Sequence, residues 1–125
     1  MIEIDIELKE SNIFGYLGNI SDPDSFLYFE AFFNEDDLSK LKEWLKSKKI
    51  IDFSVLRNIY VDETNRGTGI GSELVNLFCQ KSQNLPILLL ASPDEDDFDL
   101  VSWYEKKGFI STQFSCEDGP LMIKL

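Results

Sequence analysis

Residues 66–72 have the residue types and spacing of an anion-binding turn. Glycine occupies every second position, between a run of strand character and a run of helical character. The segment reads Arg66-Gly67-Thr68-Gly69-Ile70-Gly71-Ser72. Glycine lets a backbone turn sharply and approach a ligand closely, and the unpaired N–H groups at a helix start attract anions. The segment therefore predicts a backbone site for a pyrophosphate.

Three other kinds of site use similar glycine spacing. A dinucleotide-binding fingerprint requires glycine where Ser72 stands, and a Walker A loop requires a lysine that the segment lacks. An EF-hand loop over residues 62–73 would put Thr64 and Arg66 at positions that supply oxygen ligands, and a guanidinium cannot coordinate calcium. A glycine-rich connection without a ligand is the remaining alternative, although its glycines cost backbone entropy that an idle turn has little reason to spend.

The chain contains no histidine. This excludes Ser-His-Asp triads, Cys-His dyads, HExxH zinc sites and histidine general bases. Its cysteines, Cys79 and Cys116, have no metal-ligand spacing and are expected to be small, semi-buried apolar residues. Proton transfer must therefore use Asp, Glu, Tyr, Lys or water, and no metal is expected.

The charge balance limits the partners. The formal net charge is −11, which opposes binding to a nucleic-acid backbone. The longest apolar run, residues 85–91, is too short to cross a bilayer, and the acidic start lacks the basic region of a signal peptide. We expect a cytoplasmic protein with neither a nucleic-acid nor a membrane partner, as a monomer or homodimer.

The first half of the chain has three strand-like segments and a helix. Residues 2–8 alternate apolar and acidic side chains with the two-residue period of a strand. Residues 13–20 and 26–33, which are rich in aromatic and aliphatic side chains, predict a meander around the turn at residues 21–24. Residues 35–48 have apolar positions at helical spacing behind a candidate N-cap.

The second half alternates strands and helices. Strands are expected at residues 53–61 and 86–91, with a helix between them that ends near residue 83. A third helix is expected to begin in the acidic residues 94–99 and to end at Gly108. Residues 109–125 then predict a final hairpin. The fold class is α/β with a mixed sheet, in one domain.

Two segments resemble the signatures of the GNAT superfamily of N-acetyltransferases. The first is the glycine loop, where Arg66-Gly67-Thr68-Gly69-Ile70-Gly71 matches Arg or Gln, two residues, Gly, one residue, and Gly or Ala. The second is Trp103-Tyr104-Glu105-Lys106-Lys107-Gly108-Phe109, which is similar to the end of the family's last helix. The resemblance covers residues 55–125 and leaves residues 1–54 as a divergent half. It implies a mostly antiparallel mixed sheet flanked by helices.

The resemblance also implies a cosubstrate and roles for individual residues. Acetyl-coenzyme A would bind with its pyrophosphate on the glycine loop and its pantetheine arm along the strand edge before that loop. Tyr104 would protonate the departing thiolate, since a phenol is protonated at neutral pH. The implied cofactor-binding residues are Ile59, Tyr60, Val61, Arg66, Gly67, Thr68, Gly69, Ile70, Gly71, Ser72 and Asp97.

The sequence departs from the family at several positions. Asp97 replaces a frequent asparagine, and Arg57 replaces a frequent glutamate, so the general base is unassigned. Glu30, Asp62 and Glu63 are candidates for it, as is water. The helix pair that normally separates the first two strands and shapes the acceptor pocket is expected to be missing.

These features lead to a functional prediction with one alternative. The chain is expected to transfer an acetyl group directly to a primary amine, carried by a small molecule or a protein. Its acidic surface would favour a cationic acceptor. The alternative is a non-catalytic module that binds acyl-coenzyme A and regulates a partner.

Overall fold

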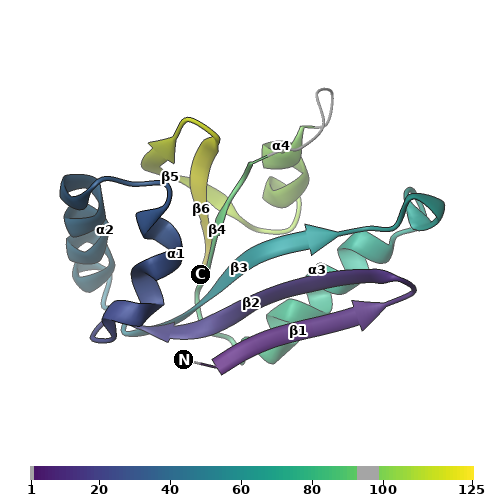
Figure 1. The fold of residues 1–125 in the computed structure, drawn as a ribbon, viewed down its shortest axis with the longest axis horizontal. Coiled ribbons are helices and arrows are strands. Elements are labelled where there is room, and N and C mark those ends of the chain that lie inside the picture. Colours follow the sequence, from purple (N-terminus) through teal and green to yellow (C-terminus); the bar gives the residue numbers. More distant parts are fainter. Residues whose placement is uncertain (1, 93–98) are drawn as a thin grey trace.

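The computed structural model describes residues 2–92 and 99–125 of the chain. Within them, a mixed sheet has the strand order β1-β2-β3-β4-β6-β5 (Figure 1). The β3–β4 pair is parallel and the other neighbouring pairs are antiparallel, which confirms a mixed, mostly antiparallel sheet. The strands are β1 Ile2–Leu8, β2 Ser11–Asn19, β3 Asp52–Tyr60, β4 Ile87–Leu90, β5 Ile110–Cys116 and β6 Gly119–Lys124.

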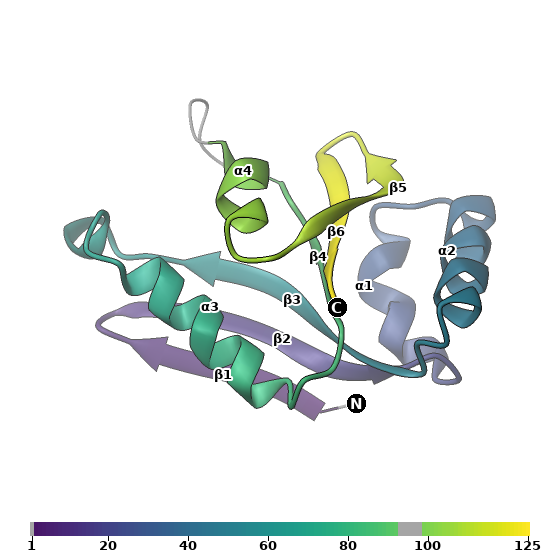
Figure 2. The same cartoon turned by 180° about the vertical axis from the view of Figure 1, so that it is seen from behind.

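Helices cover both faces of the sheet. The two views in Figures 1 and 2 place α3 on one face and α1 with α2 on the other. Each face has its own apolar cluster. No helix among the described residues is long and apolar enough to span a bilayer. The helices are α1 Leu27–Glu30, α2 Glu35–Ser47, α3 Ile70–Lys81 and α4 Leu100–Glu105, with short 3-10 turns η1 Pro23–Phe26 and η2 Glu63–Asn65.

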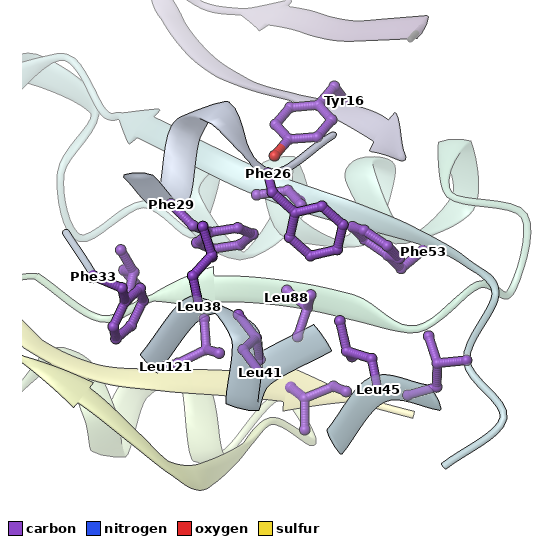
Figure 3. Close-up of a cluster of buried hydrophobic side chains, with 14 residues drawn as sticks. Tyr16, Phe26, Phe29, Phe33, Leu38, Leu41, Leu45, Phe53, Leu88 and Leu121 are labelled. Carbon is purple, nitrogen blue, oxygen red and sulfur yellow. The ribbon is translucent and has the colours of Figure 1, made fainter. Parts of the chain in front are cut away.

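The prediction of a strand over residues 26–33 is wrong, because this segment forms the end of η1, α1 and the turn after it. Pro23 stands at the start of η1, and the Asp22 side chain accepts a hydrogen bond from the Asp24 N–H at 3.0 Å. Phe26, Phe29 and Phe33 recur at three- and four-residue intervals and point into the core under the helix (Figure 3). That spacing is helical, and burial of these rings outweighs the strand propensity of aromatic residues.

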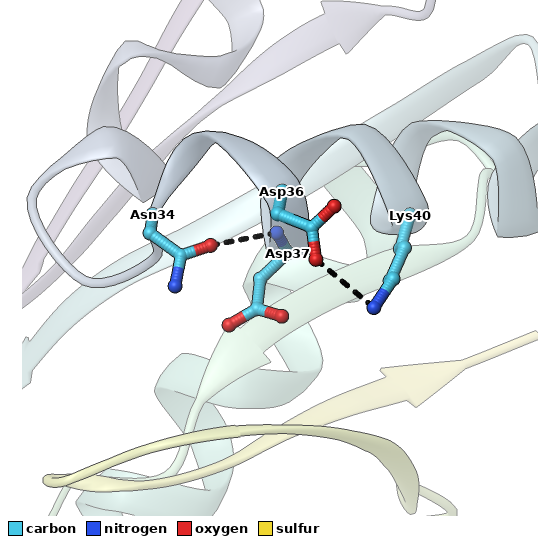
Figure 4. A network of polar contacts seen from close by, with 4 residues as sticks. All are labelled: Asn34, Asp36, Asp37 and Lys40. Atoms are coloured by element: carbon cyan, nitrogen blue, oxygen red, sulfur yellow. Dashed lines mark hydrogen bonds and ion pairs between the residues drawn. The ribbon is translucent and has the colours of Figure 1, made fainter.

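The helix predicted over residues 35–48 is confirmed as α2. The Asn34 side chain accepts a hydrogen bond from the Asp37 N–H at 2.8 Å, and Asp36 pairs with Lys40 at 3.0 Å (Figure 4). Such an exposed ion pair adds little stability. The helix is held mainly by Leu41 and Leu45, which are fully buried against the sheet.

The other predicted elements are confirmed within the described residues, where α4 represents the third helix, and the predicted start of that helix at residues 94–98 lies outside them. Strands β1, β2, β3 and β4 occupy the predicted strand segments, helix α3 precedes β4, and β5 and β6 form the terminal hairpin. Cys79 and Cys116 are free and partly buried. A tight turn at Lys9 and Glu10 joins β1 directly to β2, so no helices separate the first two strands. Instead, α1 and α2 lie between β2 and β3.

A bulge and a split in the sheet occur at the same place on β3. The register of β2 against β3 moves from Gly15↔Leu56 to Phe14↔Asn58, which leaves Arg57 as an extra residue. On the other side, the last parallel pair with β4 is Leu56↔Leu89. Beyond Leu56, therefore, β3 and β4 are no longer paired, and the sheet opens.

Candidate active site

A cavity of about 640 Å³ lies where β3 and β4 diverge. One wall is β3 from Leu56 onward with Val61 after it, and the opposite wall is α4 with Trp103 and Tyr104. Its far end is the glycine loop, residues 66–72, together with the start of α3. We call this space the first cavity. It brings together both segments that the sequence singled out.

The wall formed by β3 has an open edge. Tyr60 pairs with Asn12 of β2 on one side. On the side facing the cavity, Ile59, Tyr60 and Val61 have no strand partner among the described residues. The Arg66 Nε donates a hydrogen bond to the Val61 carbonyl at 3.2 Å, which ties the loop back to the strand. An open strand edge can bond an extended ligand as if it were an added strand.

The glycine loop adopts a backbone conformation that glycine favours. Gly67 has φ +79° and Gly69, the N-cap of α3, has φ +87°. Both lie in the left-handed region, where a Cβ is strained. An added Cβ at either position would meet nothing within 4 Å. Glycine is thus required there for conformation, and the protein leaves the space beside the backbone open.

The amides of this loop are mostly without acceptors. The Arg66 N–H donates to the Glu63 carbonyl at 3.4 Å, and the Thr68 N–H donates to the Asn65 carbonyl at 3.3 Å. No other amide of the loop has an acceptor within the described part of the chain, and no side chain caps α3. The amides without an acceptor are those of Gly67, Gly69, Ile70, Gly71 and Ser72. Together with the positive end of the helix dipole, they form an anion site.

The third glycine of the loop has a packing role. A Cβ on Gly71 would lie 3.3 Å from the Trp103 ring and 3.4 Å from Val61. Glycine at this position lets α4 approach the start of α3. The contact sets the width of the cavity between the loop and the wall that carries Tyr104.

Lys107 adds a cation beside the loop that the sequence analysis did not assign. Its Nζ donates a hydrogen bond to the Ser72 hydroxyl at 2.9 Å and lies 4.0 Å from the centre of the Trp103 ring. Burial lowers the pKa of Lys107, and the neighbouring Lys106 lowers it further. The position lies inside the Trp103–Phe109 signature, but nothing in the sequence indicates that it reaches Ser72, 35 residues away.

Tyr104 lines the first cavity from α4. It is 2% exposed, and its ring packs edge-on against Trp103 and Phe109, with centroids 5.0 and 5.4 Å away. Burial raises the pKa of its phenol well above the ordinary value of 10.0. Its hydroxyl has no hydrogen-bond partner among residues 2–92 and 99–125. The packing therefore fixes the ring and keeps the phenol protonated.

The residues considered as a general base do not line the first cavity within the described structure. Glu30 is exposed at the end of α1, and Glu63 is exposed in η2. Asp62 caps η2, and hydrogen bonds from the Thr64 side chain and N–H lower its pKa. Asp97 lies outside the described residues. Among residues 2–92 and 99–125, no group of three or more His, Cys, Asp and Glu side chains could hold a metal ion.

The fold and the cavity agree with a match to a known family. The family model described as acetyltransferase (GNAT) domain matches residues 32–111, more than half of the chain. The chain therefore belongs to the GNAT acetyltransferase family. A search of the curated proteins found no match.

Solved structures with the same fold share little sequence with this chain. The anti-CRISPR protein AcrVA5 is 22% identical over the full length of both chains, with a TM-score of 0.60. An N-acetyltransferase from Staphylococcus aureus Mu50 is 17% identical, with a TM-score of 0.55 over 97% of this chain and 67% of that one. Arabidopsis thaliana Naa50, solved with the bisubstrate analogue CoA-Ac-MVNAL, is 19% identical, with a TM-score of 0.53 over 92% of this chain and 64% of that one.

Proposed function

We propose that the protein transfers an acetyl group from acetyl-coenzyme A to a primary amine. The observation that carries this proposal is the row of acceptor-free amides in the glycine loop, at the end of a cavity whose wall is an open strand edge. A pyrophosphate linked to an extended arm matches both features at once. Membership of the GNAT family supports the same ligand.

Each part of the first cavity has a role in this proposal. The amides of the glycine loop hold the pyrophosphate, with Ser72 and Lys107 beside it. The backbone of Ile59, Tyr60 and Val61 bonds the pantetheine arm and leads the thioester toward the bulge on β3. The thioester supplies the activated acetyl group, and the protein aligns it with the acceptor amine.

The transfer requires no covalent enzyme intermediate. The lone pair of the neutral amine attacks the thioester carbonyl carbon, a C–N bond forms and the C–S bond breaks. Tyr104 donates its proton to the departing thiolate, and the proton released by the amine passes to water, from which Tyr104 is reprotonated. Holding the two reactants in line accounts for much of the acceleration that such a site can provide.

The proposed reaction requires only that the acceptor be a primary amine. Naa50 was solved with an analogue that joins coenzyme A to a peptide, so peptide amines fall within the range of the fold. The net charge of −11 favours a cationic acceptor over an anionic one at long range. Charges close to the site decide selectivity more strongly than the average surface charge, because nearby groups are screened less.

A second function is favoured by one specific observation. Arg57 occupies the bulge, at the position where the family resemblance implies a frequent glutamate, and no described acid lines the first cavity. A protein that binds acyl-coenzyme A without turning it over, and that regulates a partner, would have no need of a base there. Both functions predict tight binding of the cosubstrate.

A thiol-release assay separates the two functions. With acetyl-coenzyme A and a panel of amines that includes amino acids, arylalkylamines, polyamines and a lysine peptide, we expect amine-dependent release of free thiol from at least one acceptor. Release above the amine-free rate supports acetyl transfer. Tight binding of acetyl-coenzyme A in calorimetry without release for any amine would instead support the regulatory module.

A further inference from the structure

A second cavity of about 440 Å³ lies beside the first, between α1 and β3. Its lining is largely apolar and includes Leu27, Tyr28, Ala31 and Phe32 from the region of α1. The two cavities share Arg57 in their linings. A molecule in the second cavity therefore meets the bulge on β3 where the thioester is proposed to lie.

Two aromatic rings hold the Arg57 side chain in place. Its guanidinium carbon lies 5.4 Å from the centre of the Phe14 ring and 5.1 Å from the centre of the Tyr28 ring. Stacking on aromatic faces orients a guanidinium and leaves its N–H donors free at the edge. The bulge adds a second constraint, because it turns this side chain out of the regular strand alternation.

Arg57 makes no ion pair with any described residue, although the chain has 23 acidic residues and 12 basic ones. Its side chain also has no hydrogen bond to another described residue. Asp24 lines the second cavity but is not within 4.0 Å of the guanidinium. In so acidic a protein, a fixed cation without an acid beside it leaves its donors available to an anionic ligand.

Tyr28 interacts electrostatically with Arg57 and with Tyr104, the proposed acid. Burial raises the pKa of the Tyr28 phenol, the charge of Arg57 lowers it, and Cys116 and Asp118 of the β5–β6 hairpin raise it. The charge of Tyr28 in turn raises the pKa of Tyr104, after the larger effect of burial. Tyr28 lines the second cavity and Tyr104 lines the first, and Arg57 borders both cavities.

We infer that the second cavity binds the acceptor and that Arg57 selects an amine carrying a carboxylate, with the apolar lining taking up an apolar side chain. The inference rests on the proposed acetyl transfer and narrows its acceptor to apolar α-amino acids. Arg57 binds the carboxylate through paired N–H donors. The α-amine is two bonds from the carboxylate carbon, so the same contact holds the amine beside the bulge.

Arg57 favours an acceptor that carries a carboxylate, whereas the net charge of the protein favours a purely cationic acceptor. A polyamine or an arylalkylamine would bring an ammonium group toward an unpaired guanidinium, and like charges repel. Asp24 lines the second cavity, and Asp118 acts electrostatically on Tyr28 in the same lining, so both would attract a cationic acceptor. Control by Arg57 predicts tighter binding of an amine with a carboxylate, and control by the acids predicts tighter binding of an amine without one. A comparison of the two affinities separates these cases.

The test compares phenylalanine with phenethylamine, which differ by the carboxylate alone. Binding of each to the protein saturated with coenzyme A is measured by calorimetry, on the wild type, Arg57→Gln and Lys48→Gln. Lys48 is a matched control, because it also lies over an aromatic ring, Trp44, at 5.9 Å and lines neither cavity. We expect phenylalanine to bind at least about tenfold more tightly than phenethylamine to the wild type and to Lys48→Gln.

Arg57→Gln should remove this preference by weakening phenylalanine about tenfold or more, without weakening phenethylamine. Equal or tighter binding of phenethylamine to the wild type, or a preference that persists in Arg57→Gln, would overturn the inference. Calorimetry measures acceptor binding without turnover, so this test is independent of the thiol-release assay. Failure of thiol release with Arg57-dependent phenylalanine binding would count against acetyl transfer and not against the carboxylate site.

Discussion

We expect Gly69→Asp to weaken acetyl-coenzyme A binding by at least about 100-fold. Gly69 is the N-cap of α3 and has φ +87°. A side chain at this position enters the open space beside the acceptor-free amides. There its carboxylate would occupy the pyrophosphate site and repel the phosphates. The change is measured by calorimetric titration at low salt, where the repulsion is least screened.

Gly69→Asn is the matched control for this prediction. Asparagine has the same shape as aspartate without the charge, and it tolerates the left-handed backbone better than most residues. We expect it to bind acetyl-coenzyme A more weakly than the wild type but clearly more tightly than Gly69→Asp. If both variants bind like the wild type while remaining folded by circular dichroism, the glycine loop does not hold the pyrophosphate.

We expect Tyr104→Phe to lower kcat by about 10²- to 10³-fold and to leave the Kd for acetyl-coenzyme A nearly unchanged. The substitution removes the proposed proton donor and retains a ring of the same size between Trp103 and Phe109. Because the lost hydroxyl has no hydrogen-bond partner among the described residues, the cost in stability should be small. The measurement is single-turnover thiol release at saturating acceptor. Undiminished turnover would remove the acid role from Tyr104.

The pH profile tests the same residue independently. Burial raises the pKa of the phenol above 10.0, so the protonated form persists as the pH rises through that value. Wild-type kcat should therefore show no decline from Tyr104 between about pH 7 and pH 10, whereas an unshifted phenol would be about half ionised at the upper end. A fall centred near pH 9 that is absent in Tyr104→Phe would show that the phenol titrates earlier than its burial implies.

Much of the geometry of the candidate site could be predicted because it depends on local sequence. The glycine loop depends on backbone conformation, and alternating glycines encode that conformation directly. The strand before the loop and the helix after it follow from apolar periods of 2 and 3.6 residues. The caps of α2 and α4 are the short polar residues Asn34 and Asp99, of the type expected at helix starts.

Other features depend on long-range packing, and the sequence carries little signal for them. The strand predicted over residues 26–33 is wrong because the aromatic residues favour a strand by propensity, and their helical spacing prevails only when the rings are buried against the sheet. The bulge at Arg57 arises from pairing with β2, 43 residues earlier at Phe14. The contact of Lys107 with Ser72 likewise appears only when α4 packs on the start of α3.

The central claim is that acceptor-free amides of the glycine loop bind the pyrophosphate, and an amide-resolved NMR titration tests it most directly. On addition of acetyl-coenzyme A, the N–H signals of Gly67, Gly69, Ile70, Gly71 and Ser72 should shift together and saturate. Acetyl-pantetheine, which lacks the pyrophosphate, should shift the Ile59–Val61 signals and leave the loop signals nearly in place. Loop signals that do not move with saturating acetyl-coenzyme A would contradict the account.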